Sequence, residues 1–157
     1  MPVRFLRNAS ELADVSMVSP LPVQVANAKP VPADTLLIAT TTVDTTANRD
    51  LLGSTATELP TLDGCMQYRK LVWFYFRAGA DATNYRVLAR ATDQNGAPLG
   101  AGWQVLLEDA LPGGANSWGR IEIPSASDGY YDQYRIEVRR TAGDSNYSLT
   151  SKIVGVR

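Results

Sequence analysis

Histidine is absent from this 157-residue sequence, and cysteine occurs only once, at Cys65. The absence of histidine removes the commonest general base, the usual partner of a catalytic serine or cysteine, and the commonest transition-metal ligand. A single cysteine cannot form an internal disulfide, so the fold has to hold without that crosslink. The composition therefore argues against several classes of enzyme and predicts a protein without catalytic residues, bound metal or cofactor.

The sequence also has almost no net charge, because 15 basic and 16 acidic residues leave −1 at pH 7. Without an overall positive field, sequence-independent binding to nucleic acid is disfavoured. No apolar stretch is long enough to cross a bilayer, so we expect no membrane partner. The residues up to Asp14 contain no uninterrupted apolar run and do not predict a signal peptide, so synthesis in a cytoplasm is expected.

What the chain does contain is enough apolar material for a core, at 45% apolar and 20% charged residues. Its N-terminal part has four prolines between Pro20 and Pro32, which favour extended backbone and disfavour a helix. The helical candidate Ser10–Val18, with Ser10 as a possible cap, is limited by Pro20 to a short turn. We therefore predict an extended arm over residues 1–33 and one domain over residues 34–157.

Seven later segments combine β-branched and aromatic residues with an alternating pattern, and turn residues separate them. These segments are Thr35–Val43, Gln67–Arg77, Tyr85–Ala91, Trp103–Leu107, Trp118–Ile123, Gln133–Arg139 and Tyr147–Val154. This spacing predicts an all-β fold, an antiparallel β-sandwich or jelly roll of about seven or eight strands with an extended N-terminal arm.

Three of these segments predict how their faces are used. Leu71–Phe76 is apolar on both faces, which indicates a central strand covered on each side, with a subunit interface as one possible cover. Tyr85–Ala91 alternates, which predicts an outward basic face carrying Arg86 and Arg90. Gln133–Arg139 alternates in the same way, which predicts that its glutamine and charged residues face solvent.

Paired carboxylates are the first candidate for chemistry. Glu122 and Glu137 are placed so that they could face each other on adjacent strands, at a separation suited to glycoside hydrolysis. Arg120, Arg135 and Arg139 lie beside them in the sequence, and cross-strand ion pairs on a solvated face explain the carboxylates more simply. We therefore predict ion pairs rather than a catalytic pair.

Loop aspartates are the candidate ligands for calcium, and Cys65 is the candidate nucleophile. No EF-hand spacing is present, and aspartate stabilises tight turns through its own side chain, so turn formation is the favoured explanation. Cys65 has no recognisable partner, which favours a small buried thiol. The loop aspartates are Asp93, Asp109, Asp128, Asp132 and Asp144.

Aromatic residues give the best argument for binding. Trp73 lies in the most apolar run and is expected in the core. Trp118 follows a glycine-containing loop, and Tyr130 and Tyr131 follow another, so these three are the candidates for exposed aromatics. Exposed aromatics in this number suit either a sugar-stacking platform or a protein-binding hot spot.

The overall layout adds a resemblance to a known class. The low-charge arm that contains Pro20–Asn27 (PLPVQVAN), followed by a compact β-rich domain, resembles small structural proteins of tailed bacteriophages, especially head decoration or cement proteins. That resemblance implies a jelly-roll-like domain that forms a homotrimer on the virion surface and an arm that braces neighbouring subunits. The implied partners are the major capsid protein or other virion subunits, and the implied location is the virion.

The resulting expectation is a non-catalytic capsid decoration protein that binds its neighbours through the arm by adding strands and burying apolar side chains. Two alternatives remain open, a carbohydrate-binding β-sandwich module and a phage tail or baseplate component. The predicted partner-binding residues are Phe5, Leu6, Leu21, Val23, Val25, Trp118, Tyr130 and Tyr131.

Overall fold

The computed structural model describes residues 3–8, 11–15, 33–52, 62–100, 102–125 and 130–157. The chain divides into two compact units, residues 1–31 and residues 32–157, and each is described by itself. No helix among the described residues is long and apolar enough to span a membrane.

The N-terminal unit contains an antiparallel hairpin of β1 (Val3–Asn8) and β2 (Glu11–Val15). The strand β2 corrects the prediction of a helical turn over Ser10–Val18. Pairing with β1 satisfies the backbone of Glu11–Val15, which overrides the weak helical preference of a capping serine. Of the predicted arm residues, Phe5 and Leu6 lie in β1, whereas Leu21, Val23 and Val25 lie outside the described residues.

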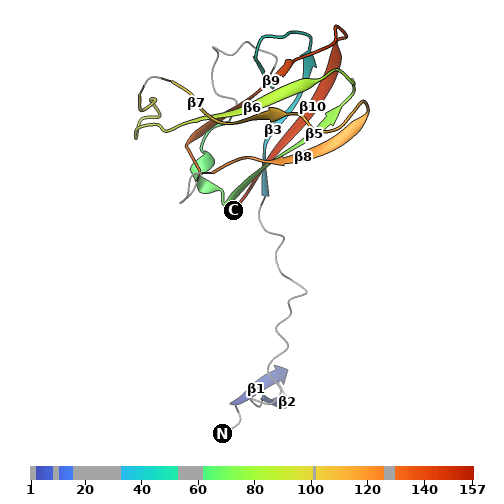
Figure 1. Cartoon of the computed structure of the whole chain (residues 1–157). Coiled ribbons are helices and arrows are strands. Elements are labelled where there is room, and N and C mark those ends of the chain that lie inside the picture. The colour runs from blue at the N-terminus through green and yellow to red at the C-terminus, as the bar shows by residue number, and fades with distance from the viewer. Residues whose placement is uncertain (1–2, 9–10, 16–32, 53–61, 101, 126–129) are drawn as a thin grey trace. The chain divides into compact units, whose positions relative to one another are not determined.

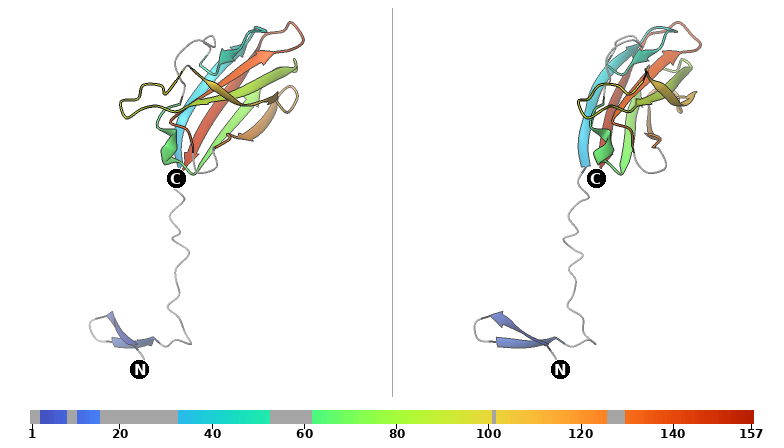
Figure 2. Two further views of the ribbon diagram at one scale, coloured as in Figure 1. Left: turned by 60° about the vertical axis from the view of Figure 1, so that its left-hand side comes forward. Right: turned by 90° about the vertical axis from the view of Figure 1, so that its left-hand side faces the viewer.

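The second unit is a sandwich of two four-stranded antiparallel sheets, which confirms the predicted all-β class (Figures 1 and 2). One sheet has the order β3-β10-β5-β8 and the other β4-β9-β6-β7. The strands are β3 (Ala33–Val43), β4 (Arg49–Asp50), β5 (Lys70–Arg77), β6 (Thr83–Arg90), β7 (Gln104–Ala110), β8 (Ser117–Glu122), β9 (Gln133–Arg140) and β10 (Tyr147–Val156), with a 3-10 turn, η2 (Cys65–Gln67), before β5. Figure 1 shows β5 between β10 and β8, as predicted for a central strand.

The core lies between the sheets and is built from the inward-facing residue of each alternating pair. Trp73 of β5 is fully buried, as predicted, and its ring contacts the rings of Tyr75 on its own strand and Tyr85 on the opposite sheet, with centroids 5.1 and 5.6 Å away. Tyr75 fits because Gly119 lies opposite it on β8, where a Cβ atom would collide with the phenol ring. A missing side chain on β8 thus makes room for a large one on β5.

One end of the sandwich is held by a buried arginine at the end of β5. Arg77 donates from Nε to the carbonyl oxygen of Gly79 at 2.9 Å, and from a terminal nitrogen to those of Leu111 and Gly113 at 3.2 and 2.9 Å. Charged donors form stronger hydrogen bonds than neutral ones, so this side chain ties the turn after β5 to the loop after β7. The loop that leads into β8, and therefore the start of β8, is positioned by that clamp.

The prediction of a solvent-facing side of β9 is wrong for three of its four residues, since Gln133, Arg135 and Glu137 are buried, whereas Arg139 is 38% exposed. The outer face of β5 is partly open within the single chain, where Phe74 is 39% exposed, so a subunit interface as its cover stays a prediction. The alternation correctly separated inner from outer residues, but what covers an outer face depends on distant parts of the chain.

Candidate binding surface

An apolar groove lies on the outer face of the sheet β3-β10-β5-β8. We call it the aromatic groove, and its volume is about 410 Å³. It is lined by Ile38, Phe74, Trp118, Thr150, Ser151 and Lys152. Three of these side chains are large, apolar and exposed, namely Trp118 at 76%, Ile38 at 70% and Phe74 at 39%.

The strand register explains why these residues meet. In one row across the sheet, Ile38 of β3 pairs with Lys152 of β10, which pairs with Phe74 of β5. Trp118 on β8 pairs with Phe76, which belongs to the neighbouring row. Because strands are spaced by about 4.8 Å and residues by about 3.3 Å along a strand, Ile38 and Trp118 form walls roughly 16 Å apart over a floor made by β10 and β5.

Trp118 projects from the edge strand β8, and its ring contacts the ring of Phe76 on the neighbouring strand β5. Its ring lies against Phe76 with centroids 5.0 Å apart and a 50° angle between the ring planes. Tilted aromatic pairs of this kind are favourable, so the contact restricts the indole while leaving most of it exposed. Pre-positioning lowers the entropic cost of using this side chain in binding.

Charged residues at the border of the groove are predominantly basic. The outward-facing charged residues of this sheet are Lys70, Arg120, Lys152 and Glu122, three positive and one negative. Glu122 is paired with Lys70 at 2.5 Å and with Arg120 at 3.0 Å, and the hydrogen bond from Lys70 is the main cause that lowers the pKa of its carboxyl. Lys152 has no ion pair within the part of the chain that the structure describes.

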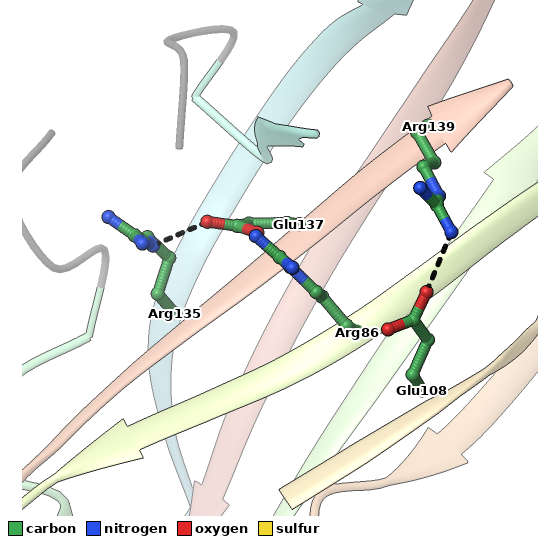
Figure 3. Close-up of polar contacts among 5 residues, drawn as sticks. All are labelled: Arg86, Glu108, Arg135, Glu137 and Arg139. Atoms are coloured by element: carbon green, nitrogen blue, oxygen red, sulfur yellow. Dashed lines mark hydrogen bonds and ion pairs between the residues drawn. The ribbon is translucent and has the colours of Figure 1, made fainter. Parts of the chain in front are cut away.

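On the opposite outer face, that of the sheet β4-β9-β6-β7, charged residues pair with one another (Figure 3). Glu137 is fully buried and forms ion pairs with Arg86 of β6 and, at 2.8 Å, with Arg135 of β9. The ring of Trp103 lies over the guanidinium groups of Arg90 and Arg135, at 4.5 and 4.8 Å. Around Glu137 the predicted solvated face is therefore a covered ionic network, in which the buried charges compensate each other, whereas the pair of Arg139 with Glu108 at 2.9 Å is partly exposed.

The carboxylate pair considered for glycoside hydrolysis is not formed. Glu122 lies on β8 of one sheet and Glu137 on β9 of the other, so the prediction that they face each other on adjacent strands is wrong. Both carboxylates are engaged in ion pairs, which confirms the simpler explanation, although Glu137 is buried rather than solvated.

Several of the other candidate groups have structural roles. Among the described residues no group of three or more carboxylate, histidine or cysteine side chains could hold a metal ion, and Asp128 lies outside them. Asp93 accepts backbone hydrogen bonds from Asn95 and Ala97 and so stabilises its own turn, as predicted. Burial raises the pKa of the Cys65 thiol to about 12, so the thiol is protonated at neutral pH, as expected for a buried cysteine.

The predicted aromatic row does not come together. Tyr130 lies by the start of β5, where its hydroxyl accepts a hydrogen bond from the amide of Leu71 at 3.2 Å. Trp118 pairs with Phe76, five residues further along that strand, roughly 17 Å away. Tyr130 and Tyr131 are half-buried and pack against Tyr134, whereas Trp118 alone is exposed. A sugar platform made of these three residues is therefore not present.

Ile38, Phe74 and Lys152 belong to the aromatic groove but were not predicted as binding residues. The signal for Phe74 is the two-faced apolar run Leu71–Phe76, because one face of a strand in a two-layer sandwich has to point outward. Ile38 is an aliphatic residue in a strand rich in threonine, and its place beside Phe74 and Trp118 could be predicted only from the strand register.

Comparison with known proteins gives no guide to the use of this surface, since no family model, curated protein or solved structure matches the chain significantly. What the described geometry can do is bind. The groove offers a restrained tryptophan, an apolar floor and a lysine without an ion pair among the described residues, which are features of a recognition surface.

Proposed function

We propose that this protein is a non-catalytic structural subunit that attaches to other protein subunits, in the manner of a bacteriophage head decoration protein. Its partners would be the major capsid protein or other virion subunits, together with further copies of itself. The observation that carries the proposal is the division of the chain into a sandwich and a separate N-terminal unit whose described part is a two-stranded hairpin.

A two-stranded hairpin needs a surface to lie against, because such a hairpin is at best marginally stable alone in water. The register of β1 and β2 pairs Val3 with Val15 and Phe5 with Ala13. Residues two apart on a strand share a face, so these four apolar residues belong to one face of the hairpin. A neighbouring protein subunit that covers this face would stabilise the hairpin and be attached by it.

Attachment through a small element suits a repeating assembly. A closed homotrimer presents the same contact three times, and linked contacts bind far more tightly than one contact does. This role requires no reacting group, only shape and apolar area. It is therefore consistent with the paired carboxylates and buried thiol described above.

The test is the solution mass, by light scattering coupled to size exclusion, of the full chain and of a chain that begins at Ala33. We expect the full chain to form a closed oligomer, with a trimer of 17.0 kDa chains as the specific prediction, and the shortened chain to have a lower mass. Phe5→Ser should lower the mass in the same way, because it removes the largest apolar side chain from the hairpin face.

Asn8→Ser is the matched control, since it changes a polar residue at the end of the same strand. A monomer for both the full and the shortened chain would contradict the proposal. Equal masses for Phe5→Ser and the unaltered chain would remove the hairpin from the interface.

A further inference from the structure

The sandwich carries a second docking surface that the hairpin does not explain. We propose that the aromatic groove binds a short segment of a partner protein in which apolar side chains alternate with acidic ones. The inference rests on the groove itself and is independent of the function proposed above. It follows from the size of the groove, its exposed aromatics and the charges around it.

The volume of the groove fits side chains rather than a broad surface. At about 410 Å³ it lies near the lower end of the range of roughly 300 to 1,000 Å³ that is usual for ligand pockets. One or two apolar side chains between the walls of Trp118 and Ile38 would cover Phe74 from solvent. Tryptophan is one of the residues enriched at interface hot spots, and here Phe76 already restrains its ring.

The excess of basic residues on this outer face favours an acidic partner segment. The whole chain has a net charge of −1, yet the charged residues on this outer face are Lys70, Arg120, Lys152 and one glutamate. Lys152 lines the groove, between Ile38 and Phe74 in the cross-strand row, and is exposed. A carboxylate next to a bound apolar side chain would pair with its ammonium group without breaking an ion pair of the described residues.

The same charges disfavour a second copy of the sandwich on this face. Two identical faces packed together would place Lys152, Lys70 and Arg120 of both copies at one interface with only two glutamates to compensate them. Like charges brought together at an interface cost free energy, whereas an acidic partner gains it. The charge balance therefore favours a different protein segment over self-association through the groove.

The test uses three dye-labelled, blocked decapeptides titrated into the full chain and followed by fluorescence anisotropy. In the first, phenylalanine and leucine alternate with aspartate; in the second, lysine replaces the aspartates; in the third, serine replaces the apolar residues. We expect the first peptide to bind at least tenfold more tightly than either of the others. Failure of the first peptide to bind, or equal binding of the first and second, would overturn the proposal.

Variants of the full chain locate the site. Trp118→Ala should weaken the first peptide at least tenfold, and Lys152→Glu should weaken the first while strengthening the second. Thr42→Ala is the control, because Thr42 is exposed on β3 but does not line the groove, and it should change nothing. Circular dichroism checks that each variant is folded.

Solution mass distinguishes binding of an acidic segment from self-association of two copies through the groove. If Trp118→Ala lowers the mass of the full chain, the groove is an interface between copies and the acidic-segment proposal is wrong. An unchanged mass together with weakened peptide binding supports it. A monomeric full chain would defeat the proposed structural role and leave the groove proposal to be decided by the peptides.

Discussion

The outer faces of the two sheets differ in which side chains they bury: one buries charged residues, and the other leaves large apolar residues exposed. On the sheet β4-β9-β6-β7, charged residues such as Glu137 and Arg135 are buried in an ionic network. On the sheet β3-β10-β5-β8, the large apolar residues Trp118 and Ile38 are exposed. The polarity of a side chain therefore does not determine its burial in this protein; the cover provided by distant segments does.

The difference also has consequences for stability. Buried charges are tolerated because each has an opposite partner, and removal of one partner leaves an expensive charge behind. Exposed aromatics contribute little to folding, because they remain in contact with water. Exposure of most of the Trp118 ring to solvent does not stabilise the fold, and this is the reason for proposing a recognition role for the aromatic groove.

The largest expected loss of stability comes from a substitution in the buried ionic network around Glu137. Glu137→Gln preserves the shape of the side chain but withdraws the negative charge from Arg86 and Arg135, and it should lower the free energy of unfolding by about 3 to 5 kcal/mol. Urea denaturation followed by circular dichroism measures this loss. Glu122→Gln is the matched control on the exposed face, and it should leave the denaturation midpoint nearly unchanged. Equal losses in the two variants would show that the faces do not differ.

A smaller effect is expected where the core supports the aromatic groove. In Gly119→Ala the new Cβ atom would collide with the ring of Tyr75, so β8 and Trp118 have to shift. We expect a loss of about 1 to 3 kcal/mol in unfolding free energy, together with weaker binding at the groove. Gly114→Ala, in a loop where the added atom meets open space, is the control and should be close to neutral. A neutral Gly119→Ala would mean that Tyr75 can move without cost.

The inner and outer residues of each strand could be predicted, because alternation depends only on neighbouring positions. Trp73 was assigned to the core and Arg86 to an outer face from this pattern alone, and both lie there. The closure of one outer face could not be predicted, because Trp103 reaches Arg90 and Arg135 from a different part of the chain. Only the three-dimensional fold brings these groups together.

Only one wall of the aromatic groove could be predicted from the sequence, because the other residues are brought to it by the fold. Trp118 was identified as a binding candidate from its position after a loop, and it is exposed. Tyr130 and Tyr131 looked equivalent in the sequence, but they pack around Tyr134 at the edge of the core. Ile38 and Phe74 join Trp118 through strand register, which links positions far apart in the chain.

The core also predicts a response to alkaline pH, through its buried cysteine. Cys65 lies next to the sheet β4-β9-β6-β7, where its amide donates to the carbonyl oxygen of Asp132, and burial raises its pKa from 9.0 to about 12. The thiol stays protonated in the fold but ionises in the unfolded chain, so stability is complete below pH 9 and falls as pH rises toward 12. The expected loss between pH 9 and pH 10 is about 1 kcal/mol.

Urea denaturation at pH 8, 9 and 10 measures the loss, and Cys65→Ala should make the loss between pH 9 and pH 10 smaller by about 1 kcal/mol without abolishing it. The remaining loss comes from the buried tyrosines, whose pKa values are raised by burial above the ordinary value of 10.0 and which begin to ionise in the unfolded chain over the same interval. An unchanged slope in Cys65→Ala would assign the effect to another group.

The division of roles between the two outer faces is tested most directly by hydroxyl-radical footprinting of the full chain, with and without the acidic, apolar peptide. Oxidation of each tryptophan is read by mass spectrometry. We predict that the peptide slows oxidation of Trp118 severalfold and leaves the rate at Trp103, on the covered face, unchanged. Protection of Trp103 in place of Trp118, or an unchanged rate at Trp118 under saturating peptide, would contradict the account.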